Sequence, residues 1–239
     1  MNTAKPLFLP HDTQWIDCEN STLLAASMAK NIAQQLILAL SDRPRASLAV
    51  SGGRTPLAML KQLSLQHLDW HRVDITLADE RWVGEHNAAS NAALVRSSLL
   101  QNKAKSATFY PLFNSEKSAE LGQKMCQITL QKMHWPLDAL VLGMGNDGHT
   151  ASLFPLCPQL QHALSAPVSQ LCIDTHAPTA PHQRMSLTAP TLLNAKHTHL
   201  HIEGLEKYQV LQQATALADP LKMPIFAILQ TPLTIHWCP

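Results

Sequence analysis

The segment from Leu137 to Pro155, LDALVLGMGNDGHTASLFP, constrains the fold more than any other part of the chain. Its first six residues form an apolar run with the length of a buried strand. Three glycines and His149 follow, and glycines let backbone N–H groups approach a ligand because no Cβ stands in the way. Because open α/β sheets build their sites at the carboxyl ends of strands, the segment predicts an α/β fold with His149 as an acid or base. The alternative is a tight turn with a helix-capping residue.

Strand and helix patterns alternate along the first two-thirds of the chain. Apolar residues recur at helical spacing through Leu40, after the capping residue Asn20. Further helices are expected after the caps Thr55 and Ser115 and at residues 90–100. Apolar runs predict strands at residues 46–50, 73–78, 108–112 and 137–142. This alternation predicts a Rossmann-like α/β fold, with a mostly parallel sheet and helices on both faces.

Beyond Pro155 the pattern changes to proline-rich connections with shorter strands, which predicts a smaller β-rich portion in the C-terminal third. A helix is expected at residues 205–217, and strands are expected at residues 170–174, 184–188, 198–203, 224–229 and 233–237. No repeat, low-complexity tract or linker divides the chain. Residues 1–239 are therefore expected to form a single domain.

The composition is that of an ordinary globular protein, with 46% hydrophobic residues and a formal net charge of +1. Near-zero charge offers no electrostatic footprint for nucleic acid or an anionic membrane, so we expect neither as a partner. The five cysteines form no C-x-x-C pair, which favours free thiols. Residues 1–15 lack the pattern of a signal peptide, and no stretch approaches 18 uncharged apolar residues. We therefore expect a cytoplasmic protein without a transmembrane helix.

Three of the expected strands end in polar or glycine-rich loops that would emerge at one edge of a parallel sheet: SGGRTP (51–56), DERW (79–82) and GMGNDGHT (143–150). The first has the layout of an anion cradle, because Gly52 and Gly53 expose N–H groups and Thr55 adds a hydroxyl at a helix N-terminus. It lacks the spacing of a Walker A loop and the G-x-S-x-G order of a nucleophilic serine. Phosphate is the natural ligand, and a structural turn is the alternative.

The other two loops carry ionisable side chains. Asp79, Glu80 and Arg81 belong either to a surface ion cluster or to a site in which Arg81 steadies an oxyanion or phosphate and an adjacent carboxylate orients a base. Asn91 follows closely and offers neutral hydrogen bonds to sugar hydroxyls. Asp147 stands two residues before His149, where a carboxylate fixes the tautomer of an imidazole and raises its basicity.

A histidine pattern, HTHLH, occurs at residues 197–201. A strand would place its three histidines on one face, which raises a metal site as an alternative. No cysteine or carboxylate set accompanies them at ligand spacing, so we expect no metal.

Taken together, the three loops resemble the 6-phosphogluconolactonase family. That family's pattern is SGG-S-TP, then DER with a following SN, then GMG-x-DGHTASLFP, and it is matched here by SGGRTP (51–56), DERWVGEHNAASN (79–91) and GMGNDGHTASLFP (143–155). Two later segments, PHQRMSLT (181–188) and EGLEK (203–207), resemble further family motifs and point to Arg184 and Lys207. Arg54 and Asn146 depart from the pattern, in place of a small residue and a proline.

The resemblance implies hydrolysis of 6-phospho-D-glucono-1,5-lactone to 6-phosphogluconate in the oxidative pentose phosphate pathway. It implies His149 as the base for an attacking water, Asp147 as its orienting partner and Arg81 as the stabiliser of charge on the carbonyl oxygen. The implied substrate and phosphate ligands are Gly52, Gly53, Arg54, Thr55, Asp79, Asn91, Arg184 and Lys207. No cofactor is expected, and the protein is expected to be a monomer or weak homo-oligomer.

Two other functions stay open. Glucosamine-6-phosphate deaminases share the phosphate loop and the DGH motif, but they follow the histidine with I-A-F-N-E-P, whose glutamate serves ring opening. Here Leu153 and Phe154 replace the Asn-Glu pair, which favours a lactonase. The second alternative is a catalytically silent sugar-phosphate sensor. The presence of Asp147 and His149 beside Arg81 speaks against it, because binding alone needs no base.

Overall fold

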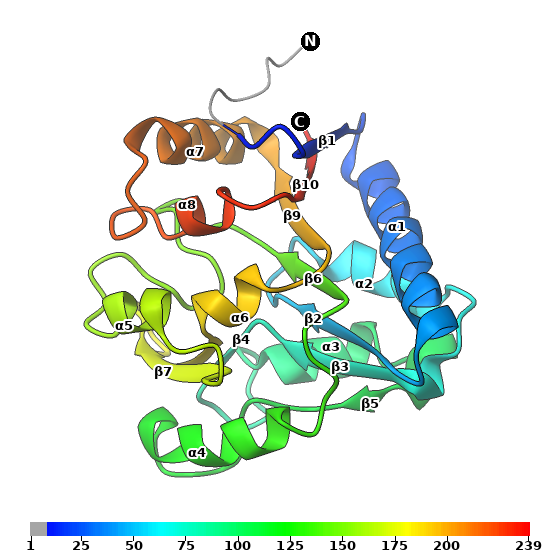
Figure 1. Ribbon diagram of the computed structural model, residues 1–239, viewed down its shortest axis with the longest axis horizontal. Coiled ribbons are helices and arrows are strands. Elements are labelled where there is room, and N and C mark those ends of the chain that lie inside the picture. The colour runs from blue at the N-terminus through cyan, green and yellow to red at the C-terminus, as the bar shows by residue number, and fades with distance from the viewer. Residues whose placement is uncertain (1–8) are drawn as a thin grey trace.

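A seven-stranded sheet runs through the centre of the computed structural model, which describes residues 9–239 (Figure 1). Every neighbouring pair of its strands is parallel. All residues of β2, β3 and β6 are buried, which explains why β2 and β6 read as nearly continuous apolar runs. In spatial order the strands are β1 (Gln14–Asp17), β10 (Thr234–Cys238), β9 (Thr198–Glu203), β6 (Ala139–Leu142), β2 (Ala46–Val50), β3 (Val73–Leu77) and β5 (Thr108–Phe109).

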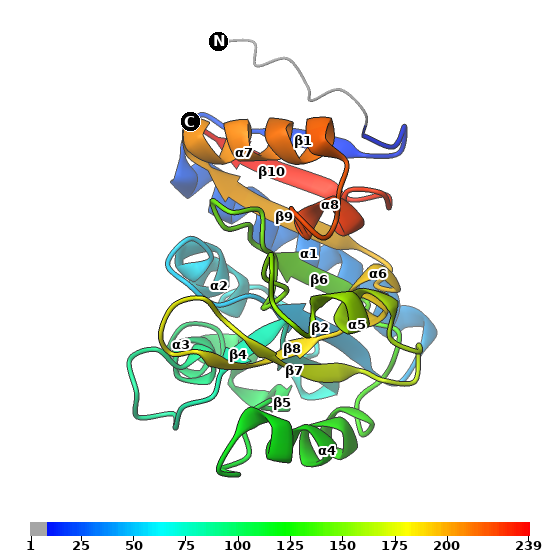
Figure 2. The ribbon, with the colours of Figure 1, turned by 90° about the vertical axis from the view of Figure 1, so that its left-hand side faces the viewer.

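Helices cover both faces of this sheet, as the two perpendicular views show (Figures 1 and 2). On one face, α1 (Ser21–Asp42) packs against α2 (Leu57–Ser64). On the other lie α6 (Ala189–Leu193), α7 (Gly204–Leu217) and α8 (Ile225–Ile228). The predicted α/β architecture is thus confirmed. The remaining helical segments are α3 (Asn91–Ser98), α4 (Ala119–Leu130), α5 (Leu160–Ser165) and two 3₁₀ turns, Trp70–Arg72 and Asn102–Ser106.

A second, antiparallel sheet contains β4 (Asp79–Arg81), β8 (Gln183–Leu187) and β7 (Cys172–His176). Only Ala78 separates β3 from β4, so the DER segment leaves the main sheet at once and pairs with β8. This register places Arg81 opposite Arg184. The expected β-rich C-terminal portion is therefore divided between two sheets, because β9 and β10 join the main one.

The strand order reverses at β2. From β2 the chain proceeds through β3 to the edge strand β5, and then adds β6 on the other side of β2. In open parallel sheets, ligands bind outside the carboxyl ends of the strands at such a switch point. The loops that follow β2 and β6 therefore flank the expected crevice.

Local capping signals explain the starts of several helices, with two corrections. Asn20 caps α1 as predicted, since its side chain accepts the N–H of Leu23. Ser118, not Ser115, caps α4, because Ser115 has a positive φ of 66° that does not suit a helix cap. The start of α2 has no side-chain cap, so Thr55 does not have the predicted capping role.

The predicted strand at residues 224–229 is wrong, because this segment contains the one-turn helix α8. Its apolar, β-branched and aromatic residues favoured a strand. Pro224 instead has φ −58° and ψ −26°, values that suit the start of a helix, where a missing N–H costs nothing.

Two features bear on the expectations about cellular location. The five cysteines are free thiols, as predicted. Within residues 9–239, α1 is the one helix long and apolar enough to cross a membrane by length and composition alone, with a mean hydropathy of 1.3. Its buried residues pack into the core, and core helices that do not cross a membrane can have the same length and apolar composition. The signal-peptide prediction rests largely on residues 1–8, which lie outside the described part.

Two buried histidines connect the sheet to α1. Nδ1 of His199 lies 2.9 Å from Nε2 of His236, and Nε2 of His199 lies 2.7 Å from Oε1 of Gln35. Burial lowers the pKa of His199 to about 4 and that of His236 to about 2. Both imidazoles are therefore neutral in the folded protein at pH 7. Within residues 9–239, no group of three or more His, Cys, Asp or Glu is arranged to hold a metal ion.

We expect the free energy of unfolding to fall as the pH drops below about 6.5. In that range the unfolded chain takes up protons on His199 and His236 while the folded protein does not, so acid favours the unfolded state. Each proton contributes a slope of up to about 1.4 kcal/mol per pH unit. Urea unfolding from about pH 5 to pH 7 should give a shallower slope for His236→Gln than for the exposed control His162→Gln. Equal slopes would contradict this account.

Candidate active site

A pocket of about 370 Å³ opens at the carboxyl ends of β2, β6 and β9. This size suits a small metabolite. The structure brings residues of all three predicted loops to its walls, together with residues of β8, α7 and the end of β9. Of the predicted site residues, those that line the pocket are Gly52, Gly53, Thr55, Asp79, Arg81, Asn91, His149, Arg184 and Lys207.

Two predicted residues do not line the pocket. Arg54 is exposed on the loop after β2, and it does not line the pocket. Asp147 instead lies behind His149: its Oδ1 is 2.5 Å from Nδ1 of His149 and accepts the backbone N–H of the same residue.

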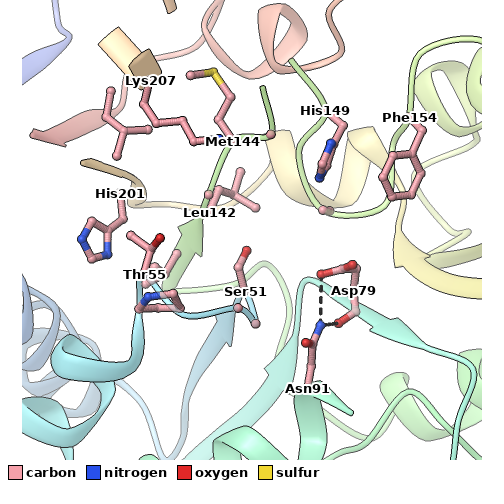
Figure 3. Close-up of a pocket in the computed structure, with 18 of the residues that line it drawn as sticks. Ser51, Thr55, Asp79, Asn91, Leu142, Met144, His149, Phe154, His201 and Lys207 are labelled. Carbon is pink, nitrogen blue, oxygen red and sulfur yellow. Dashed lines mark hydrogen bonds between the residues drawn. The ribbon is translucent and has the colours of Figure 1, made fainter. Parts of the chain in front are cut away.

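In the half-buried His149 side chain, one ring nitrogen is a hydrogen-bond donor and the other is an acceptor. Asp147 accepts from Nδ1, so the lone pair of the neutral imidazole resides on Nε2. Burial raises the pKa of Asp147, but its hydrogen bond and charge interaction with His149 lower it, and the net shift is downward. Figure 3 shows His149 and Phe154 on one side of the pocket, with His201, Thr55 and Lys207 on the other. The imidazole is thereby prepared to accept a proton at Nε2.

Two glycines permit close approaches within the site. A Cβ on Gly145 would lie 2.1 Å from Nδ1 of His149, and a Cβ on Gly52 would lie 1.9 Å from Oδ1 of Asn91. Both distances are far below van der Waals contact. The motif therefore needs glycine at these positions because other side chains occupy the space.

Two arginines meet at the β4–β8 wall of the pocket. Nη1 of Arg81 donates to the carbonyl oxygen of Ala89 at 2.7 Å. The guanidinium of Arg184 lies 5.8 Å from the ring centroid of Phe154, whose ring centroid is 4.6 Å from that of His149. Burial lowers the pKa of Arg184, and the charge of Asp79 opposes this shift. Two neighbouring guanidinium groups in a partly dry pocket favour an anionic ligand.

A third cation enters from α7. Nζ of Lys207 donates to Oδ1 of Asn146, whose Nδ2 donates to Glu206 at 2.5 Å. Burial lowers the pKa of Lys207, while Glu206 and Asp147 oppose the shift. Asn146, which replaces a common proline of the family pattern, thus links the DGH loop to α7 through an amide that proline lacks.

Four buried polar atoms on the pocket-lining residues have no hydrogen-bond partner within residues 9–239. They are Oγ of Ser51, Nε of Arg81, Oδ1 of Asn91 and Nδ1 of His201. Buried polar groups in proteins are almost always paired, so unpaired ones need an explanation. A polar ligand bound in this pocket explains these unpaired atoms, because they include both hydrogen-bond donors and acceptors.

Glu80, a fully buried residue, holds two of these segments together. Its Oε1 accepts the N–H groups of Arg81 and Asn91 at 2.7 and 2.8 Å, and its Oε2 accepts that of Ala92 at 2.7 Å. Burial raises the pKa of Glu80 to about 7, although these backbone donors oppose the rise. The sequence prediction did not assign Glu80 a role, yet it fixes Arg81 and Asn91 relative to each other.

We expect Glu80→Gln to lower the melting temperature and to raise KM for the substrate. The amide NH₂ would face N–H donors, and each buried donor left unpaired costs about 1–3 kcal/mol. Arg81 and Asn91 should then lose their fixed positions. Thermal unfolding and steady-state kinetics test this, with Glu85→Gln as the matched control, because Glu85 is a partly exposed carboxylate paired with Arg96. Similar values for both variants would contradict the positioning role.

Sequence reasoning also missed several pocket-lining residues. Phe154 lies inside a recognised motif, but an apolar side chain gave no chemical signal. His201 was considered only as a metal ligand. Glu203 ends β9, and its position at the carboxyl end of a strand was the signal that could have identified it.

Comparisons with known proteins identify the family of the chain. The model of the family described as glucosamine-6-phosphate isomerases/6-phosphogluconolactonase matches residues 19–237. The chain is 45% identical to a 6-phosphogluconolactonase of Pseudomonas aeruginosa, over 90% of each chain. It superposes with a TM-score of 0.93 and 42% identity on the crystal structure of a 6-phosphogluconolactonase from Shewanella baltica, covering 97% of this chain and 100% of that one.

A monomeric glucosamine-6-phosphate deaminase also has a similar structure, with a TM-score of 0.77 over 94% of this chain and 97% of that one. Its sequence identity is only 16%. This likeness shows a shared fold and leaves the chemistry to be argued from the site.

Proposed function

The chain belongs to the glucosamine-6-phosphate isomerase/6-phosphogluconolactonase family, and we propose that its pocket hydrolyses 6-phospho-D-glucono-1,5-lactone to 6-phosphogluconate. It is an enzyme of the lactonase type, given its identity with curated 6-phosphogluconolactonases over most of both chains. The substrate is a small sugar-phosphate lactone, and the reaction belongs to the pentose phosphate pathway.

The proposed base is His149. Nε2 removes a proton from a water molecule that attacks C1 of the lactone, and Asp147 holds the imidazole by accepting from Nδ1. Arg81 stabilises the negative charge that develops on the carbonyl oxygen. A positioned base contributes roughly 10²–10⁴-fold, which suits an ester that already opens slowly without help.

The 6-phosphate is proposed to bind the loop of Gly52, Gly53 and Thr55, with cations from two walls. Arg184 contributes from β8 and Lys207 from α7. Asp79 and Asn91 line the same pocket and offer hydrogen bonds to the sugar. Fixing the remote phosphate orients the reacting carbon, which increases the rate of the chemical step.

The observation that carries this proposal is the Asp147–His149 pair facing a pocket that also contains two arginines and a lysine. The test is hydrolysis of freshly generated phosphogluconolactone, measured by base titration or by a coupled dehydrogenase. We expect hydrolysis well above the spontaneous rate and no ammonia release from glucosamine 6-phosphate. Ammonia release would support a deaminase, and binding of 6-phosphogluconate without turnover would support a sensor.

A further inference from the structure

The turn from β9 into α7 forms a wall of the pocket. His201 and Glu203 of β9 and Lys207 of α7 all line the pocket from this wall. Figure 3 shows His201 beside Thr55, on the side opposite His149 and Phe154. Of these three residues, the sequence motifs identified only Lys207.

His201 and Glu203 form a hydrogen-bonded pair. Nε2 of His201 lies 2.9 Å from Oε1 of Glu203, and the His201 side chain is 2% exposed whereas that of Glu203 is 32% exposed. Burial lowers the pKa of His201, and the carboxylate of Glu203 opposes this shift. A neutral imidazole that donates from Nε2 leaves Nδ1 as an acceptor, and Nδ1 has no hydrogen-bond partner within residues 9–239.

The pair leaves a carboxylate oxygen available to a ligand. Oε2 of Glu203 accepts no hydrogen bond from any described residue. Glu203 is also the N-cap residue of α7, but its side chain makes no capping hydrogen bond, so among the described residues only His201 holds the carboxylate. The helix N-terminus favours a negative charge at this position.

The charge of the pair defines the class of group that it binds. A neutral imidazole and a carboxylate together carry one negative charge, which disfavours a phosphate or a carboxylate at the His201–Glu203 pair itself, while Lys207 of the same wall is a cation. A carboxylate oxygen accepts strongly from hydroxyl donors. The arginines that favour an anion lie on a different wall, at β4 and β8. The His201–Glu203 pair therefore suits a hydroxyl group of a sugar, and Lys207 stays available to the phosphate.

We propose that Glu203, held in place by His201, binds a ring hydroxyl of the phosphosugar lactone and determines specificity for that hydroxyl. This inference rests on the proposed function, because it assigns the orientation of that substrate within the same pocket. Glu203 contacts the substrate, while His201 acts through Glu203 and is a positioning residue.

The test compares phosphogluconolactone with its 2-, 3- and 4-deoxy analogues. Glu203→Ala should lower kcat/KM for phosphogluconolactone roughly 10–100-fold, mainly through KM. For one deoxy analogue, kcat/KM should be the same in wild type and variant, because that analogue lacks the hydroxyl that Glu203 binds. Loss by one equal factor on every member of the series, or no loss at all, would overturn the proposal.

Matched variants separate recognition from folding. Glu19→Ala removes an exposed carboxylate outside the pocket and should behave as wild type. His201→Gln retains an N–H donor and should keep more discrimination between phosphogluconolactone and its deoxy analogues than His201→Leu.

If wild type itself fails to hydrolyse phosphogluconolactone, the proposed function fails and this inference with it. If wild type is active and Glu203→Ala is unaffected, only this inference fails.

Discussion

His149→Ala is expected to reduce kcat for phosphogluconolactone by about 10²–10⁴-fold. The substitution removes the pocket-lining imidazole that Asp147 holds through Nδ1 and that keeps Nε2 free to take a proton from water. Affinity for 6-phosphogluconate should change little, because the cations that attract its phosphate come from other segments. Steady-state kinetics give kcat, and calorimetry gives the affinity.

The control for this variant is His162→Ala, which removes an exposed histidine outside the pocket and should leave kcat unchanged. The kcat of Asp147→Asn should lie between those of His149→Ala and His162→Ala, since the imidazole remains but loses its charged partner. Turnover of His149→Ala near that of wild type would eliminate the histidine as the base.

Arg184→Ala is expected to raise KM about 10–100-fold with a smaller effect on kcat. Arg184 is buried, and Nε donates to the carbonyl oxygen of Pro181, which directs the rest of the guanidinium towards the pocket. Removing it should leave a phosphate with fewer charge-assisted hydrogen bonds. Kinetics with phosphorylated and unphosphorylated gluconolactone measure the loss.

The ratio between these two substrates provides the control. The preference of Arg184→Ala for the phosphorylated lactone should fall, while hydrolysis of the unphosphorylated lactone stays close to that of wild type. Arg96→Ala, which removes a surface arginine paired with Glu85, should preserve the preference. Equal losses on both substrates would place Arg184 at the reacting carbon instead of the phosphate.

The sequence predicted six of the seven strands of the main sheet, helped by apolar runs such as those of β2 and β6, and it missed the edge strand β1 (Gln14–Asp17). The strand boundaries at residues 46–50 and 198–203 match β2 and β9. The convergence of three loops followed from the rule that the carboxyl ends of parallel strands share one edge. The family match extends to residues 19–237, beyond the region from about residue 48 to residue 208 that the motifs cover.

The remaining features depend on tertiary contacts that local sequence does not carry. The segment 224–229 has strand-like composition, but proline and its surroundings make it helix α8. Glu80 could not be distinguished from a surface acid, because its burial follows from the pairing of β4 with β8. Arg54 was assigned from its position in a loop, whereas its side chain is exposed and does not line the pocket.

A crystal structure of the complex with 6-phosphogluconate tests the central claim most directly. We predict the product carboxylate, which derives from C1, beside Nε2 of His149, with the phosphate on the loop after β2 and on Arg184. The opposite orientation, with the phosphate at His149 and the carboxylate at Arg184, would contradict this account of the reaction.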